Sequence, residues 1–430
     1  MGIAKSSGAR WSVIAMSFFV AFFCDVKTIN AYLSPSSSEE TGGPMALLYI
    51  FSVLGVIVLG LIYNNSKYKK IPVSALVLMT LVVLFYLVTA LFIGKPYTSL
   101  PFFCVLTISA FMIPFVSSID VRLFLKFMML LSVPAILHLK EIFVFVSAYS
   151  ETVSMGTCYS FLMPIIATVV YMFSYYSQEK LWQKLITIVL LLVNMVFAFF
   201  LITFGSRGPV FAILATILYF WLVRYDHRNQ KIRVNKKRLL VFGIAAVFLV
   251  LLFIPALAAL KNLLDHFGIS LNFINKFLTK NDNGDITNGR SILYVMAFAD
   301  IAKHPFLGNG FDQFFNNHGE IAAYPHNFLL QMVYDGGLLF LSVVLFFLVK
   351  GIRRLLHHCT YDDFILSAAM LFSSVPRAMF SGDLWQNGPL WMFFGLLLAK
   401  SFAVPNKKYP GISIKSRKNE YGQKKIKAKL

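Results

Sequence analysis

The chain has 430 residues, of which 58% are hydrophobic, 16% aromatic and only 13% charged. Ordinary globular proteins carry about 25% charged residues, so roughly half of the expected charge is missing. This composition excludes a soluble globular protein, a disordered chain, a collagen and a disulfide scaffold, and it indicates a membrane protein. The formal net charge is nevertheless +20, which raises the question of which side of a bilayer holds the surplus.

Apolar segments follow one another along the chain, each close to the roughly 20 residues that a membrane-spanning helix needs. They predict an all-α integral membrane protein with about twelve transmembrane helices. The first segment is long and is followed by eleven others, so it is not a cleavable signal peptide. The segments cover residues 11–33, 44–63, 71–93, 98–118, 121–138, 157–177, 183–204, 209–225, 239–260, 327–349, 364–380 and 388–404.

The positive charges agree with this alternation. With the N-terminus in the cytoplasm, the inner segments hold 29 of the 39 Lys and Arg residues, and the outer segments keep 10 cations against 13 of the 19 acidic residues. An excess of Lys and Arg in cytoplasmic segments is the usual signature of orientation. We therefore expect a multi-pass protein of the cytoplasmic membrane with both termini inside the cell, and most of the basic charge reflects topology.

The sequence predicts one polytopic membrane domain, residues 1–404, followed by a basic cytoplasmic tail, residues 405–430. The tail is rich in lysine and poor in apolar residues, a composition typical of disorder. We interpret it as an aid to orientation that attracts anionic lipids, and we expect no nucleic-acid partner. The cysteines have no metal-ligand spacing and are predicted to be free thiols; they are Cys24, Cys104, Cys158 and Cys359.

One large extracytoplasmic loop, residues 261–325, is predicted between the ninth and tenth helices. Loops of this length without a role are uncommon. Apolar residues at helical spacing predict a short helix over residues 290–303 within it. Thr287 or Asn288 could cap the start of that helix, and Pro305 would end it.

Arginine stands at two helix starts that the topology directs toward the outer face. Arg290 lies in the first turn of the loop helix, and Arg207 lies in Gly205-Ser206-Arg207-Gly208-Pro209 at the start of the eighth span. A cation at a helix N-terminus is unfavourable because it opposes the helix dipole. An anion bound between the arginine and the free N–H groups would compensate for this. The alternative for Arg207 is a lipid-headgroup contact. The sequence predicts an anion-binding pocket at the outer face.

Other polar residues near the outer face leave alternatives open. His326 precedes the tenth span and is expected either to cap that helix or to take part in chemistry. Asp25 and Lys27 form either an ion pair or part of a polar cavity. The loop histidines, His266, His304 and His318, have no metal-ligand spacing, so no metal is expected. The glycines at 308–310 and 336–337 are interpreted as conformational.

Three segments together resemble the O-antigen ligase and Wzy-type polysaccharide polymerase superfamily. The resemblance is at the level of motifs from about residue 200 to 350, with aromatic Tyr294 and acidic Asp335 where the family often has tryptophan and glutamate. The segments are Gly205-Ser206-Arg207-Gly208; Gly289-Arg290-x3-Tyr294 with His304-Pro305-x2-Gly308-x-Gly310; and Pro325-His326-Asn327-x2-Leu330-x4-Asp335-x-Gly337.

The resemblance implies a GT-C-like glycosyltransferase that uses neither a metal nor another cofactor. It would transfer a glycan from undecaprenyl diphosphate to an acceptor hydroxyl, with inversion at the sugar carbon. Arg207, Arg290 and Asn327 would bind the diphosphate or substrate, and His326 would be the base or a diphosphate ligand. Tyr294, Asp335, Arg377 and Asp383 are further candidates.

The leading hypothesis is therefore a polymerase of lipid-linked repeat units for a capsule, exopolysaccharide or O-antigen. Its partners would be the lipid-linked donor, the glycan acceptor and membrane lipids, with a flippase and a chain-length regulator as further candidates. A ligase that uses lipid A core as acceptor is the alternative. A transporter or flippase for lipid-linked glycan is less favoured, because it predicts charged residues at mid-helix along a path.

Overall fold

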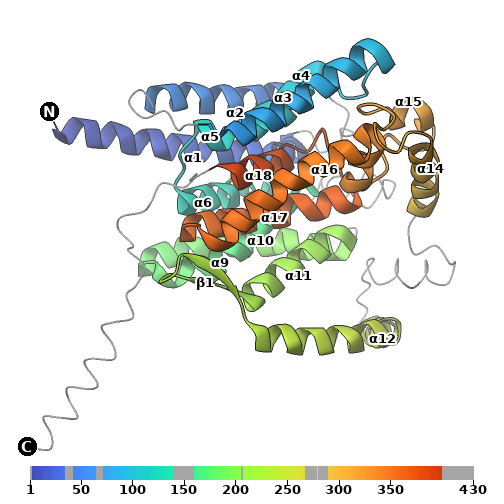
Figure 1. Ribbon diagram of the computed structural model, residues 1–430. Coiled ribbons are helices and arrows are strands. Elements are labelled where there is room, and N and C mark those ends of the chain that lie inside the picture. The colour runs from blue at the N-terminus through green and yellow to red at the C-terminus, as the bar shows by residue number, and fades with distance from the viewer. Residues whose placement is uncertain are drawn as a thin grey trace, which may run out of the picture.

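The computed structural model describes residues 2–33, 42–63, 71–138, 159–204, 207–266, 278 and 289–399. Long helices lie side by side in a bundle (Figure 1), with α14 and α15 at one end and the strand β1 at the opposite end. We call these the loop end and the hairpin end. The tail at 405–430 lies outside the described residues.

The helices alternate in direction along the bundle, and several are extended by π or 3-10 turns. They are α1 (Gly2–Leu33), α2 (Gly42–Tyr63), α3 (Val73–Val88) with η1 (Thr89–Ile93), α4 (Leu100–Phe102) with η2 (Phe103–Ser109) and α5 (Ala110–Val116), α6 (Val121–Leu131) with η3 (Val133–His138), α9 (Leu162–Ser174) with η4 (Tyr176–Gln178), α10 (Leu181–Phe204), α11 (Arg207–Leu222), α12 (Lys236–His266), α14 (Arg290–Lys303), α15 (Phe314–His318), α16 (Phe328–His357), α17 (Tyr361–Phe380) and α18 (Gly388–Leu398).

Each apolar segment found in the sequence has a helical counterpart. Among the described residues, six helices are long and apolar enough to cross a membrane, and four shorter apolar helices accompany them. Several boundaries differ from the prediction; α16, for example, continues to His357 and not to 349. α12 continues to His266, so the large loop begins there and not at 261, and α18 ends at Leu398. The structure shows a mostly helical membrane protein, while twelve crossings stay a prediction.

The mostly helical structure agrees with the all-α prediction, and one short β-hairpin, which was not predicted, interrupts it. The end of the predicted eighth span is instead a strand, β1 (Val223–Asp226), which pairs antiparallel with β2 (Lys231–Val234). Tyr225 on β1 stacks on Phe364 and donates its hydroxyl to the carbonyl of Cys359, 2.6 Å away. Aromatic packing and this hydrogen bond hold the hairpin against the bundle.

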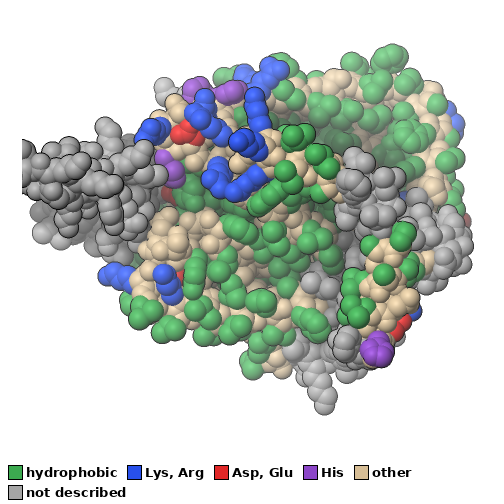
Figure 2. All heavy atoms as spheres, turned by 90° about the horizontal axis from the view of Figure 1, so that it is seen from below, with side chains coloured by type: hydrophobic (Ala, Val, Ile, Leu, Met, Phe, Trp, Pro, Cys, Tyr) green, Lys and Arg blue, Asp and Glu red, His purple; other side chains and the backbone are tan. Residues whose placement is uncertain are grey.

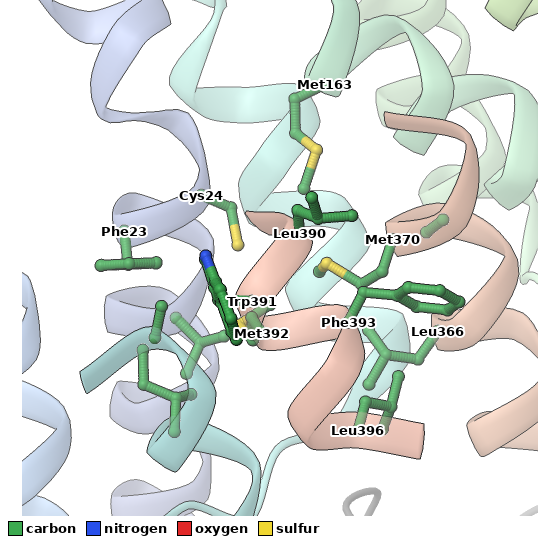
Figure 3. Close-up of a cluster of buried hydrophobic side chains, with 14 of the residues drawn as sticks. Phe23, Cys24, Met163, Leu366, Met370, Leu390, Trp391, Met392, Phe393 and Leu396 are labelled. Atoms are coloured by element: carbon green, nitrogen blue, oxygen red, sulfur yellow. The ribbon is translucent and has the colours of Figure 1, made fainter. Parts of the chain in front are cut away.

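The densest part of the core lies where α1, α9, α17 and α18 meet. Figure 3 shows Trp391 of α18 between the side chains of Phe23 and Met392, with Met163 and Met370 close by. Trp391 is fully buried, and its Nε1 donates to the carbonyl of Leu384 at 2.9 Å. A buried indole N–H needs such a partner. The described cysteines, Cys24, Cys104 and Cys359, are free thiols, as predicted, and Cys158 lies outside the described residues.

The predicted loop helix is present as α14, and it packs on α16 around Asp300. The carboxylate of Asp300 accepts hydrogen bonds from His318 Nε2 at 2.7 Å and from the hydroxyl of Tyr334 at 3.1 Å, and pairs with Lys303 at 2.8 Å. Burial opposes ionisation of Asp300, yet these hydrogen bonds outweigh it and lower its pKa. The network ties α14, α15 and α16 together at the loop end.

α16 is interrupted at Gly337, where the backbone has φ 66° and ψ −172°. The break releases helix carbonyls, and the turn at residues 305–310 bonds to them. Asn309 N donates to Tyr334 O and Gly310 N to Asp335 O, each at 2.8 Å, while Leu338 N donates to Pro305 O at 2.9 Å. Non-helical backbone at a membrane boundary is tolerated where the protein itself satisfies its polar groups.

Candidate functional site

A cavity of about 620 Å³ opens at the loop end between α1, α2, α9, α17 and the connections that precede α4, α16 and α18. Four residues singled out in the sequence line it: Lys27, His326, Arg377 and Asp383. The remaining polar lining consists mainly of hydroxyl and amide groups, from Tyr49, Tyr97, Ser99, Tyr159, Ser160, Tyr324, Ser373, Ser381, Gln386 and Asn387.

His326 is held in a strained position on the cavity wall. Its φ of 54° is in the left-handed region, which non-glycine residues rarely adopt. The ring packs edge-on against Tyr324, with centroids 4.5 Å apart, and Tyr324 donates its hydroxyl to Ser381 O at 3.0 Å. Strained residues cluster at functional sites, and this geometry fixes the imidazole in one orientation.

The environment keeps His326 neutral. Burial, and then the positive charge of Arg290, lower the pKa of the His326 imidazole to about 4. Its Nδ1 is buried without a hydrogen-bond partner among the described residues. A neutral imidazole can accept a proton or a hydrogen bond from a ligand.

The cap of α16 is Asn327 and not His326, which corrects one of the two alternatives for the histidine. Asn327 Oδ1 accepts from Leu329 N at 3.0 Å and from Leu330 N at 3.1 Å. Asparagine is a preferred N-cap because its short carboxamide reaches these two N–H groups. Capping leaves the His326 ring available for other contacts, and the substrate-binding role of Asn327 stays a prediction.

Arg290 stands at the first position of α14, as the sequence predicts, and its charge acts on His326. The N-cap position is Gly289, with φ 77° and no side-chain hydrogen bond to the helix. The predicted caps, Thr287 and Asn288, lie outside the described residues. Ile292 N donates to the carbonyl of Gly289 at 3.2 Å, so the first turn of α14 is closed by the backbone, and an anion-binding role for Arg290 stays a prediction.

The start of α11 lies beside the cavity. α11 begins at Arg207, whose side chain is outside the described part of the structure. A Cβ added at Gly208 would collide with the hydroxyl of Tyr159, a cavity-lining residue. The guanidinium of Arg377 lies over the ring of the same tyrosine, 5.4 Å from its centroid. Tyr159 therefore joins the glycine-arginine motif of α11 to the arginine of α17.

Asp383 is held by a buried polar chain. Its Oδ1 accepts from Gln331 Nε2 at 2.7 Å and from Trp385 N at 3.1 Å, and Gln331 Oε1 accepts from Leu384 N at 2.9 Å. Its Oδ2 is buried without a partner among the described residues. Burial raises the pKa of the Asp383 carboxyl, which makes it a better proton acceptor than a solvated aspartate.

Asp335 does not line the cavity and supports its wall instead. It is fully buried, and its Oδ2 accepts from Trp385 Nε1 at 2.7 Å. Trp385 stacks on Phe311 of the large loop, with centroids 3.9 Å apart. Tyr294 packs with Leu293 of α14 against α16, away from the cavity-lining set. Both positions indicate structural roles for these two residues.

The structure favours the cavity interpretation for Lys27, which lines the pocket. Asp25 is fully buried and accepts a hydrogen bond from Thr28 at 2.5 Å. The positive charge of Lys27 also acts on Asp383 across the cavity. The lining thus combines two cations with a carboxylate and a neutral imidazole.

Two kinds of residue in this site were missed in the sequence. Tyr159 and Tyr324 gave no signal, because tyrosines near membrane boundaries are common interface residues. Gln331 could have been found, since it is a lone amide four residues after Asn327 in an otherwise apolar run. In the described part of the chain, no three His, Cys, Asp or Glu side chains come together as metal ligands would.

Residues 191–345 match the model of the O-antigen ligase family. The match runs from the second half of α10 through α11, the β1–β2 hairpin, α12, α14 and α15 into α16, and it includes the turn that docks at the break in α16. No curated protein matches the chain. The matched region also contains Arg207, Arg290 and His326, of which only His326 lines the cavity, while Lys27, Tyr159, Arg377 and Asp383 line it from outside the matched region.

Proposed function

We propose that the protein, whose residues 191–345 match the O-antigen ligase family model, polymerises undecaprenyl-diphosphate-linked oligosaccharide repeat units. The observation that carries the proposal is the cavity lined by His326, Arg377 and Asp383, with Arg290 acting on the histidine. It would work at the outer face of the bacterial cytoplasmic membrane, where the predicted topology places the loop end.

The reaction is an inverting displacement. The acceptor hydroxyl oxygen forms a bond to the anomeric carbon, and the bond from that carbon to the lipid diphosphate breaks. The diphosphate leaves with the electron pair, and its developing charge needs preorganised cations in a site of low dielectric constant. Arg207 and Arg290 are assigned this role, and Arg377 lies on the same cavity. These residues would do the work that a metal ion does in other transferases.

The proton of the acceptor hydroxyl goes to a base on the cavity wall. His326 is neutral because of its lowered pKa, so it can take the proton or hydrogen-bond the diphosphate. Asp383, with an unpartnered oxygen and a raised pKa, is the second candidate. We favour His326, because its imidazole is neutral and its buried Nδ1 has no partner among the described residues, so it can accept the proton.

A ligase that transfers the finished glycan to lipid A core would use the same donor chemistry. It would differ from a polymerase only in its acceptor. The outer face is predicted to be slightly acidic, with 10 cations against 13 acids, which disfavours a phosphorylated acceptor and supports the polymerase. A flippase would need charged residues along a path through the bilayer, and the polar lining of this cavity lies at one end of the bundle.

The test uses membranes of a strain that makes the polymer. Arg290→Ala, Arg207→Ala and His326→Ala should each abolish chain elongation while the protein inserts at its usual level. Lys303→Ala is the matched control, because Lys303 is an exposed cation at the other end of α14 and should leave elongation unchanged. Polymer of normal length from Arg290→Ala would contradict the diphosphate assignment.

A gene deletion separates the two acceptors. Single repeat units on the cell surface without polymer identify a polymerase, whereas accumulated lipid-linked polymer identifies a ligase. EDTA should leave the activity intact if the arginines act without a metal. A reporter that places residues 289–325 in the cytoplasm would overturn both transferase proposals.

A further inference from the structure

The β1–β2 hairpin is amphipathic and separates its two faces cleanly. Residues alternate between the faces of a strand, so Val223 and Tyr225 point one way with Ile232 of the partner strand. These three pack against the bundle. The opposite face carries the charged residues of both strands, and it points away from the protein core.

That outward face sets two arginines directly opposite each other. In the antiparallel register, Arg224 pairs with Arg233, and Asp226 pairs with Lys231. Arg233 also forms an ion pair with Asp226 at 2.6 Å. Among the described residues no carboxylate pairs with Arg224. Like charges directly opposite in a sheet are destabilising, so the register leaves one cation that an anion from outside would neutralise.

A hollow lies over this pair. It has a volume of about 540 Å³ and is lined by both strands and by Arg228 and Asn229 of the turn. Seen from below (Figure 2), the Lys and Arg side chains gather at the hairpin end, and a largely hydrophobic surface adjoins them. Arg224, Arg228 and Arg233 line the hollow together with one carboxylate, Asp226, which pairs with Arg233. The lining is therefore net positive and suits the oxygens of a phosphate group.

The neighbouring surface is apolar and exposed. On α11, Phe211 is 55% and Leu214 60% exposed, and on α12, Leu240 is 67% exposed. Where the apolar and basic surfaces meet, Arg238 lies over the ring of Trp221 and donates to its carbonyl at 2.7 Å. Tryptophan and arginine at such a boundary are typical of the bilayer interface.

We propose that the outward face of the hairpin binds the phosphate headgroup of an anionic phospholipid, whose acyl chains lie along the exposed apolar residues of α11 and α12. The headgroup bridges Arg224 and Arg233 and removes their repulsion. Phospholipid is favoured over a free phosphate because the basic hollow and the apolar surface are continuous. This site is separate from the loop-end cavity and does not depend on the proposed transferase activity.

The test compares the full-length protein in nanodiscs of phosphatidylglycerol and of phosphatidylcholine. The wild-type protein should unfold at a higher temperature in phosphatidylglycerol, and native mass spectrometry should show retained phosphatidylglycerol. Arg224→Gln should lose the thermal difference and retain about fivefold less of this lipid, since one basic residue contributes about 1 kcal/mol to binding an anionic surface. In phosphatidylcholine, Arg224→Gln should be as stable as wild type or more stable, because it relieves the repulsion.

Lys180→Gln is the control, because Lys180 is an exposed cation beside α10 that does not line the hollow. It should keep the full preference for phosphatidylglycerol. An unchanged lipid preference in Arg224→Gln would overturn the proposal, and so would equal destabilisation of this variant in both lipids. If inorganic phosphate alone reproduces the thermal shift in phosphatidylcholine, the site binds free phosphate and the lipid assignment is wrong.

Discussion

Gly308 lies directly against Gly337, and a Cβ on Gly308 would come 2.5 Å from the backbone nitrogen of Gly337 and would overlap the carbonyl of Asp335. Both glycines have positive φ, 71° and 66°. The contact joins the large loop to the break in α16, and α16 begins two residues after His326. The position of the histidine therefore depends on two glycines about thirty residues apart in the chain.

Gly308→Ala should destabilise the protein by about 2–5 kcal/mol. The left-handed conformation costs a non-glycine residue about 1–2 kcal/mol, and the overlap with backbone atoms adds about 1–3 kcal/mol. Thermal unfolding in detergent measures the loss. Gly243→Ala in α12 is the control, because no atom lies within 4 Å of its added Cβ. If Gly308→Ala unfolds at the wild-type temperature, the docking of loop and helix is not what holds this end together.

The pH dependence of activity should report on His326. The acidic limb of the wild-type profile should have an apparent pKa of about 4, because the histidine loses its ability to accept a proton only when it is protonated. If Arg290→Gln retains some activity, the apparent pKa of its acidic limb should rise toward 6.5. Removing the positive charge of Arg290 favours the protonated imidazolium form of His326.

The same shift predicts the pH dependence of stability. The unfolded histidine has a pKa of about 6.5, so between pH 6.5 and about 4 the unfolded chain binds more protons than the folded one. Folding stability should fall as the pH decreases through this window. His326→Gln should reduce that dependence, and Lys180→Gln, at an exposed cation outside the cavity, should not. If His326→Gln loses as much stability as the wild-type protein between pH 6.5 and 4, the pH dependence comes from other groups.

Gly208→Ala and Tyr159→Phe should be coupled. The added methyl group of Gly208→Ala collides with the tyrosine hydroxyl, and the next nearest atom of the ring, Cζ, lies 3.0 Å away. The single Gly208→Ala variant should therefore lose stability and glycan transfer. The double variant should regain part of both, because removal of the hydroxyl opens the space. Strict additivity of the two changes in a double-mutant cycle would contradict this contact.

Asp335→Asn should be tolerated, whereas Asp335→Leu should lose about 1–3 kcal/mol of stability. Trp385 Nε1 donates to one carboxylate oxygen, and the other is buried without a partner among the described residues. A carboxamide oxygen can still accept that hydrogen bond, but leucine leaves the buried indole N–H unsatisfied. Unfolding curves give the stabilities, and elongation assays show whether Asp335 has any role beyond support. If a stable Asp335→Asn protein no longer elongates the polymer, Asp335 would again be a catalytic candidate.

The helical layout was predictable because hydropathy alone determines where apolar helices can form. The predicted bounds of the loop helix, residues 290–303, agree with α14, because apolar periodicity marks the helix and Pro305 marks its end. The hairpin was missed although its signal is present. Val223, Tyr225, Ile232 and Val234 alternate with charged residues, and this period of two was hidden at the end of a long apolar run.

The site was predicted only in part, because its walls come from segments far apart in the chain. The sequence identified His326, Arg377 and Asp383 as separate candidates, and the structure brings them to one cavity. It could not indicate that Tyr159 lies between Gly208 and Arg377, since such contacts leave no local pattern. The cap of α16 was placed one residue early, because histidine and asparagine stand side by side before the helix.

The cavity wall runs from Cys24 in the first helix to Pro389 in the last, which has a consequence for biosynthesis. The segment of the family match, residues 191–345, is synthesised before Arg377 and Asp383. Until α17 and α18 are in place, the pocket lacks one wall, and Gln331 lacks the carboxylate to which it donates. A chain truncated before α17 would therefore contain the whole family match and still have no complete cavity.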